Sequence, residues 1–314
     1  MLCADRVGEY INKNPILKVH SVYKRTVNLW MGNEVCALYP QELSSTPMSA
    51  VLPMNENTFL KMTNLARCFG KLTIHGGQLL IDGNVWEVGD IKSWNPIIKK
   101  QLTQKEGYRL GEAVKNFINE AEDTGDSFGR GVVAALSSQN KKEQNYAKVS
   151  IVKNALLSRV ASILNSNGKT MENLGKAAAE MIGLGIGLTP SGDDFLIGML
   201  LAFWTSKELS HNMFSLFARE IAKKTDNTNE ISRQFLLCAC RGEFGSLFHR
   251  LISHVGTDEN ISEDLRQIQR IGHSSGMDTL NGILTGLWMC GRVQNGNIDM
   301  DRSGKPNCSA VSFD

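Results

Sequence analysis

The residues best suited to chemistry lie in one glycine-rich stretch that reads GLGIGLTPSGDD. Gly183, Gly185 and Gly187 alternate along it, and two adjacent carboxylates, Asp193 and Asp194, end it. Glycine lets the backbone adopt conformations closed to other residues or approach a ligand closely. The stretch runs into an apolar helix, so its N–H groups are expected at the positive helix terminus, where anions bind. It therefore predicts a binding site for a phosphate or a carboxylate.

The start of that helix has two interpretations. Thr189 followed by Pro190 has the pattern of an N-cap and a first helical residue, since proline has no N–H to leave without a partner. Ser191 and Asp194 instead have the spacing of a capping box. A tight turn before a capped helix is the alternative to a binding site, but it leaves one aspartate and three glycines without a role. We expect Asp193 and Asp194 to be catalytic, and the residues of this stretch that bind substrate to be Gly185, Gly187, Thr189, Ser191 and Gly192.

A second segment, which begins at Ser275, repeats the first at a constant offset of 84 residues. The two agree at Ser, Gly, Asp, Leu, Gly and Leu, and the repeat aligns Asp278 with Asp194. A glycine four residues after each aspartate, Gly198 and Gly282, allows two helices to cross closely. We expect a pseudo-symmetric pair of helix starts that face one pocket; chance similarity of two helix caps is the alternative. The residues of the second segment expected at this pocket are Ser274, Ser275, Gly276 and Asp278.

A polar run from Thr225 to Ser232 precedes another apolar helix. The amide of Asn229 and the hydroxyl of Ser232 can exchange hydrogen bonds with a small polar ligand. We expect both at the same pocket, and a solvated loop between helices is the alternative.

Several other kinds of site are disfavoured. No lysine follows the last glycine of the first stretch, and its glycine spacing is not that of a dinucleotide-binding motif. His249 and His254 are five residues apart, whereas two zinc ligands on one helix face are four apart. No Ser/His/Asp or Cys/His arrangement is evident, so no covalent intermediate is expected. We expect no cofactor and no bound metal, with Mg²⁺ that accompanies a phosphate as the alternative.

The elements that must position these residues fall into two regions. In the first hundred residues the apolar stretches are short and β-like, and Gly76-Gly77 joins two of them as a hairpin. Farther along, apolar residues recur at helical spacing. The sequence therefore predicts an α+β fold: a β-rich, antiparallel N-terminal domain at 1–100 and an α-helical domain at 101–293. A polar and mobile tail is expected at 294–314.

Periodicity also places individual helices. One helical stretch is expected within the β-rich domain, at 57–68. An apolar stripe from Leu110 to Ala121 opens the helical domain. Further helices are expected at 149–164, 171–184, 193–206, 211–223, 230–241, 244–254, 261–271 and 277–290.

Composition excludes several classes of protein. The chain has 314 residues, of which 42% are hydrophobic and 21% charged, the balance of a globular chain with a sizeable core. Its 34 basic and 32 acidic residues leave a net charge of +2, so no nucleic-acid partner is expected. The apolar run 195–204 is about half of the ~20 residues that span a membrane, so no membrane partner is expected. Seven scattered cysteines fit free thiols in the cytoplasm.

The stretch GIGLTPSGDDFLIG, which starts at Gly185, resembles the AllH family, formerly a family of unknown function. The helix at Ser232 and the segment SSG at Ser274 are similar to the other polar landmarks of that family, in the same order. The resemblance covers most of the chain, from about residue 19 to about residue 292. It implies a subunit of oxamate carbamoyltransferase, an enzyme of allantoin and purine breakdown that also requires AllF- and AllG-like subunits.

The implied reaction converts oxalurate and phosphate into oxamate and carbamoyl phosphate. These four compounds are small anions, as the helix starts predict. Carbamoyl transfer needs a polarised carbonyl and two reactants held in line, and it needs no redox cofactor. Backbone N–H groups at 191–194 and 275–278 are expected to meet that need, while Asp193 or Asp194 relays a proton or orients the loop.

Three functions compete at this point. The chain is the catalytic or co-catalytic subunit of a carbamoyltransferase, a non-catalytic scaffold or anion-sensing subunit, or a stand-alone enzyme that acts on another small amide or acid. Adjacent aspartates beside a glycine-rich loop favour the first function over the second, because a scaffold has little use for them.

Overall fold

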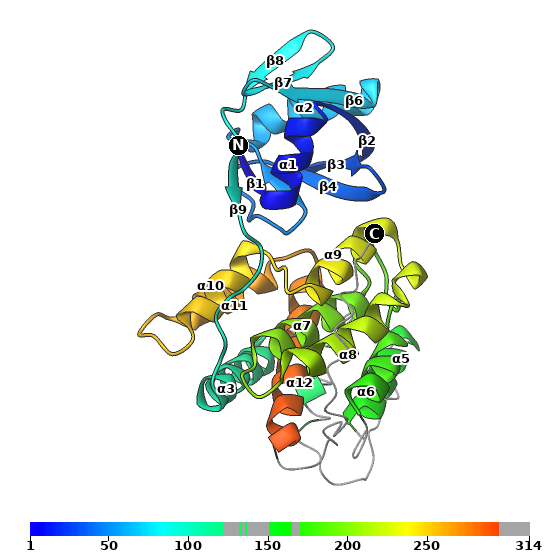
Figure 1. Ribbon diagram of the computed structural model, residues 1–314, viewed down its shortest axis with the longest axis vertical. Helices are drawn as coiled ribbons and strands as arrows, with labels where there is room; N and C mark the ends of the chain where they lie inside the picture. The colour runs from blue at the N-terminus through cyan, green and yellow to red at the C-terminus, as the bar shows by residue number, and fades with distance from the viewer. Residues whose placement is uncertain (122–127, 129–131, 134–135, 137–150, 165–169, 295–314) are drawn as a thin grey trace.

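A sheet-rich N-terminal region and a helical C-terminal region lie one above the other (Figure 1), so the expected α+β fold is confirmed. The domain limits at residues 100 and 293 stay predictions. The expected tail lies, except for its first residue, outside the part of the chain that is described. The computed structural model describes residues 1–121, 128, 132–133, 136, 151–164 and 170–294.

The N-terminal region holds one nine-stranded sheet among the described residues, in the order β8-β7-β6-β2-β3-β4-β5-β1-β9. Most neighbours are antiparallel, as expected, but β1 pairs with β9 and β4 with β5 in parallel. The expected hairpin forms, with positive φ at Gly76 and Gly77. The strands are β1 (Leu2–Ala4), β2 (Ile16–Tyr23), β3 (Thr26–Met31), β4 (Glu34–Tyr39), β5 (Ser49–Val51), β6 (Lys71–His75), β7 (Gln78–Ile81), β8 (Asn84–Glu87) and β9 (Lys92–Trp94).

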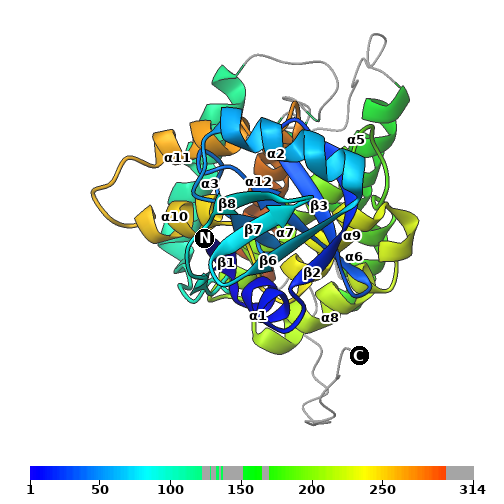
Figure 2. The same ribbon diagram turned by 90° about the horizontal axis from the view of Figure 1, so that it is seen from above.

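Two helices pack against this sheet (Figure 2). Helix α2 (Glu56–Phe69) lies where a helical stretch was expected, and the side chain of Asn55 caps its N-terminus. Helix α1 (Asp5–Lys13) was not expected, although its buried Val7 and Ile11 have the four-residue spacing of one helix face.

The helical region follows the expected periodicity closely. Helix α6 ends five residues before the expected residue 184, because the glycine-rich stretch turns the chain there. Its described helices are α3 (Gln104–Glu120), α5 (Ile151–Leu164), α6 (Met171–Ala179), α7 (Ser191–Thr205), α8 (His211–Ala222), α9 (Glu230–Cys240), α10 (Ser246–His254), α11 (Ile261–Gln269) and α12 (Ser275–Gln294), with the short 3₁₀ helix η1 (Thr225–Asn227) before α9.

Each region has its own hydrophobic core, and α9 links them. Helix α7 is buried along almost its whole length and lies at the centre of the helical core with α12. Helix α9 contacts β4, and its Cys238 is part of the core of the sheet region. The two regions therefore meet along α9 and the segment that follows it.

Backbone hydrogen bonds hold the two regions together beside α9. The N–H of Phe244 donates to the carbonyl of Pro96 at 2.8 Å, and the N–H of Ser246 donates to Ser45 at 2.9 Å. The ring of His249 forms a 2.8 Å hydrogen bond to the same Pro96 carbonyl. These bonds fix the walls of the space between the regions.

Candidate functional site

The two repeated segments form a crossing of α7 and α12. A Cβ on Gly198 would overlap the carbonyl oxygen of Thr279, and a Cβ on Gly282 would overlap that of Phe195. These contacts are reciprocal, since Thr279 and Phe195 are themselves 84 residues apart. The expected close crossing of a pseudo-symmetric helix pair is confirmed, and it brings the two helix starts to the same end of the helical core.

The glycine-rich stretch adopts backbone conformations that favour glycine. The φ angles of Gly183, Gly185 and Gly187 are 79°, 131° and 105°. A Cβ on Gly185 would meet the N–H of Ser191, whereas a Cβ on Gly187 would stand in open space. Two glycines of the stretch are therefore explained by the fold of the chain itself, because a Cβ on Gly183 would likewise meet the carbonyl of Asn227.

Both interpretations of the helix start are wrong. Helix α7 begins at Ser191, and Pro190, with extended ψ, occupies the N-cap position without a side-chain cap. The hydroxyl of Thr189 does not cap the helix; it forms a 2.8 Å hydrogen bond with the hydroxyl of Ser275 instead. This bond ties the glycine-rich stretch to the start of α12.

Most N–H groups at the start of α7 already have partners. Gly192 donates to the carbonyl of Leu184 at 2.8 Å, and Asp193 and Asp194 donate to Pro190 at 2.9 and 3.1 Å. The expectation that these donors lie free for an anion is wrong, because the preceding turn folds its carbonyls onto them.

N–H groups at the start of α12 also have partners within the chain. Gly276 donates to the carbonyl of Ile271 at 3.0 Å, and Asp278 donates to Ser274 at 2.9 Å. The carboxylate of Asp278 is fully buried and accepts from the N–H of Phe128 at 3.1 Å. Asp278 thus lies behind the helix start, within the core.

Asp193 is a structural carboxylate. It is fully buried; its Oδ1 accepts from the N–H of Gly183 at 2.8 Å, and its Oδ2 accepts from the hydroxyls of Thr228 and Ser232 at 2.5 and 2.6 Å. Burial raises its pKa, and these three hydrogen bonds oppose the shift. Asp193 therefore fastens the glycine-rich stretch to the start of α9.

Asn229 also joins the glycine-rich stretch to the start of α9. Its Oδ1 accepts from the N–H groups of Ile231 and Ser232 at 3.1 Å, which caps α9, and its Nδ2 donates to the carbonyl of Leu188 at 2.9 Å. Asn229, Ser232 and Asp193 form one cluster behind the glycine-rich stretch, where their polar atoms are engaged with the protein.

Asp194 differs from Asp193 in its hydrogen bonding. Its side chain is 5% exposed, and Oδ2 has no hydrogen-bond partner among the described residues. Burial raises the pKa of Asp194 well above its ordinary range, and the negative charge of Asp278 adds to this, whereas the nearby hydroxyls of Ser275 and Thr189 act in the opposite direction. Its burial therefore favours the protonated form of Asp194 more than a position at the surface would.

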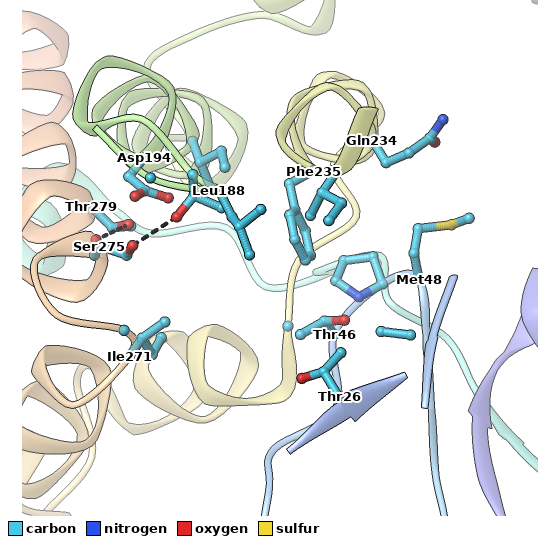
Figure 3. Close-up of a pocket in the computed structure, with 18 of the residues that line it drawn as sticks. Thr26, Thr46, Met48, Leu188, Asp194, Gln234, Phe235, Ile271, Ser275 and Thr279 are labelled. Carbon is cyan, nitrogen blue, oxygen red and sulfur yellow. Dashed lines mark hydrogen bonds between the residues drawn. The ribbon is translucent and has the colours of Figure 1, made fainter. Parts of the chain in front are cut away.

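Asp194 lines a cavity of about 560 Å³ between the two regions. Figure 3 shows Asp194, Ser275 and Thr279 on the side of the helical core, and Thr26 and Thr46 on the side of the sheet. Phe235 of α9 and Met48 form part of its apolar wall. The volume is typical of a site for a small molecule.

The charged groups on the cavity wall are few. Among the described residues that line the cavity none is Lys or Arg. Glu243 lines it, but both of its carboxylate oxygens accept from Arg241, at 3.0 and 2.9 Å, and Arg6 lies 3.9 Å away. The wall is therefore mainly apolar, with hydroxyl and amide groups and two acids, Asp194 and the paired Glu243.

The structure brings only some of the expected site residues to this cavity. Those that line it are Gly187, Thr189, Asp194, Ser274 and Ser275. Those that do not are Gly185, Ser191, Gly192, Asp193, Asn229, Ser232, Gly276 and Asp278. A Cβ on Gly192 would meet the carbonyl of Met181, so this glycine serves packing.

The sequence did not predict several polar residues that line the cavity outside the expected segments. Thr279 aligns with the apolar Phe195 in the repeat, so the comparison of the two segments did not indicate a polar residue at that position. Gln234 follows the polar run before α9, and its Oε1 is buried without a partner among the described residues. Thr26 and Asn28 lie on β3, and nothing in the sequence relates that strand to α7.

Within the described ranges, no three His, Cys, Asp or Glu side chains gather in a way that could hold a metal ion. No helix in the described part of the chain is long and apolar enough to cross a membrane.

Fold and site together define an α+β protein with a small-molecule cavity between a sheet and a helical core. Residues 181–287 match the model of the family described as oxamate carbamoyltransferase subunit AllH, which confirms the resemblance to that family over this segment. The match covers 107 of the 314 residues, including Asp194 and Ser275, and the sheet lies outside it. No solved structure matches the chain.

That family description names a subunit of oxamate carbamoyltransferase, that is, of a transferase with more than one subunit.

Proposed function

We propose that this chain is the subunit of an oxamate carbamoyltransferase that binds the carbamoyl-bearing reactant in the cavity between its sheet and its helical core. The single observation that carries the proposal is the position of Asp194, a buried acid at the α7–α12 crossing that faces the cavity inside the matched segment. Small-molecule sites combine an apolar wall with a few well-placed polar groups, and this cavity has that composition.

The proposed reaction takes oxalurate and phosphate to oxamate and carbamoyl phosphate, in allantoin breakdown in the cytoplasm. The bond between the carbamoyl carbon and the inner nitrogen of oxalurate breaks, a phosphate oxygen bonds to that carbon, and a proton goes to the nitrogen of the departing oxamate. The chain's share is to hold the carbamoyl group. AllF- and AllG-like subunits complete the site, and no cofactor is required.

A second candidate, a binding subunit that supplies no catalytic group, is favoured by a specific observation. The described cavity wall has no Lys or Arg to neutralise a phosphate, and the N–H groups of Gly192, Asp194 and Gly276 are engaged within the chain. In that case the phosphate is held by groups of another subunit.

Carbamoyl phosphate formation, measured with the purified chain alone and with candidate partner subunits, separates the two candidates. The cavity is tested by Thr46→Trp, which fills it from a half-buried loop position, with Leu60→Trp on the exposed face of α2 as the control. We expect Thr46→Trp to abolish activity of the complex and Leu60→Trp to leave it unchanged. Full activity of folded Thr46→Trp would refute a role for the cavity.

A further inference from the structure

The face of the sheet that meets the cavity carries the buried amide of Asn28 among apolar side chains. Asn28 lies on β3, directly across from Ala37 of β4 and Ser21 of β2. Ala37 and Val35 line the cavity with it. Asn28 lines the cavity although only 4% of the residue is exposed. A carboxamide enclosed in this way needs a hydrogen-bond partner at each of its two ends.

One end of the amide is held within the sheet. Nδ2 of Asn28 donates to the hydroxyl of Ser21 at 2.9 Å, and that hydroxyl forms a second 2.9 Å hydrogen bond with Nδ1 of His20. His20 lies in a register shift of β2 against β3, between Val19 and Ser21, and such irregularities re-aim side chains. The ring of His20 lies edge-on to that of Trp30, with centroids 4.7 Å apart. These contacts hold the Asn28 side chain with Nδ2 towards Ser21.

The other end of the amide, Oδ1, has no partner among the described residues. It is an acceptor, because Nδ2 is the atom that donates to Ser21. Oδ2 of Asp194 is enclosed without a partner, but Oδ1 of Asn28 is not among the described atoms in that condition and keeps surface towards the cavity. An acceptor held in this orientation requires an N–H or O–H donor from the ligand.

We infer that Asn28 is a specificity-determining residue of the cavity, whose Oδ1 accepts a hydrogen bond from an amide N–H of the ligand. This inference rests on the proposed function, because it concerns the reactant of that same cavity. Oxalurate and oxamate carry amide N–H groups, whereas a carboxylate oxygen in the same place would face the oxygen of Asn28 with no hydrogen between them. The sheet region, which lies outside the matched segment 181–287, thereby contributes to the choice of ligand.

Oxamate and oxalate are suitable probes, because they have nearly the same shape and differ in an amide against a carboxylate. The dissociation constant of each for the full-length chain is measured by titration calorimetry at neutral pH in wild type, Asn28→Leu and Asn28→Asp. Leucine keeps the size of asparagine without a polar atom and suits the apolar neighbours, whereas aspartate keeps the acceptor and adds a negative charge. Asn64→Leu, at an exposed position of α2 outside the cavity, is the control.

We expect wild type and Asn64→Leu to bind oxamate about 10-fold more tightly than oxalate, the effect of one hydrogen bond, and Asn28→Leu to lose that preference. Asn28→Asp should enlarge the preference, because its carboxylate still accepts the N–H and repels the second carboxylate of oxalate. A folded Asn28→Leu protein that keeps the wild-type preference would overturn the inference and leave the proposed function standing.

Binding by wild type separates the inference from the proposed function. If wild type binds both probes equally, the inference fails and the proposed function stands. If it binds neither probe, alone or with candidate partner subunits, both fail together. If Asn28→Leu does not fold, Asn28→Asp decides, since a preference equal to that of wild type would place the ligand away from Asn28 and overturn the inference.

Discussion

Replacing Gly198 by alanine tests the helix crossing that brings the two repeated segments to one cavity. The added Cβ would stand 2.7 Å from the backbone nitrogen of Ile283 and 3.0 Å from the Cα of Gly282. Comfortable contacts are about 3.5–4.0 Å and the overlap with the carbonyl oxygen of Thr279 is closer still, so α7 and α12 must separate by about 1 Å or more. Backbone atoms cannot rotate away as a side chain can, and the strain therefore spreads along both helices.

The expected effect is a net loss of stability. Overpacking a core costs about 1–3 kcal/mol, and clashes with backbone fall at the upper end of that range. Alanine has a better helix propensity than glycine by about 1 kcal/mol, which offsets part of the cost. We expect a net destabilisation of about 2 kcal/mol, or about 4–8 °C in the melting temperature of a region of this size.

Gly111→Ala provides a matched control, because Gly111 also lies inside a helix, α3. A Cβ there would be 3.9 Å from the side chain of Leu287, an ordinary contact. The control should gain about 0.5–1 kcal/mol from propensity alone. The assay is thermal and urea unfolding followed by circular dichroism. Equal stabilisation of the Gly198 and Gly111 variants would refute the close crossing.

Three other variants probe the carboxyl groups. Asp193→Asn should lose about 1–3 kcal/mol of stability, because an amide has one acceptor oxygen and its NH₂ must then face either the N–H of Gly183 or the hydroxyls of Thr228 and Ser232; an unchanged urea midpoint would contradict its structural role. Asp194 has a raised pKa in the folded state, so its contribution to stability is fully present below its unfolded pKa of about 3.9 and is lost as pH rises towards the folded pKa. Asp194→Asn should therefore be more stable than wild type at neutral pH, by a margin that grows with pH; a pH-independent difference in unfolding free energy would count against a raised pKa. Ser275→Ala removes the hydroxyl that joins the two helix starts and should raise the pKa of Asp194 further, which ¹³C NMR of the carboxyl carbon would detect as a shift of its titration to higher pH.

The sequence predicts the elements of this fold better than their arrangement. Apolar periodicity is a local property, and it places most helices to within a few residues of their observed bounds. The Gly198–Gly282 crossing was also predictable, because an exact offset of 84 residues puts two small residues at equivalent positions of two helices. The pairing of β1, a three-residue strand, was not predictable, since so short a segment has no periodicity of its own.

At the site, too, local features were predicted and long-range contacts were not. Asp194, Ser274 and Ser275 were predicted from residue types beside glycines, and they line the cavity. The free N–H groups at the helix starts were not confirmed, because their acceptors are carbonyls, such as that of Leu184, which every residue possesses and no sequence pattern reveals. The contribution of Thr26 depends on how the sheet docks against α9, a long-range arrangement.

The most direct test of the central claim is a crystal structure of the chain with oxalurate at saturating concentration. The account predicts oxalurate in the cavity between the sheet and the helical core, with its terminal carbamoyl group on the side of the cavity that Asp194 lines. Oxalurate bound elsewhere on the chain, or in the cavity with its carboxylate rather than its carbamoyl group towards Asp194, would contradict it.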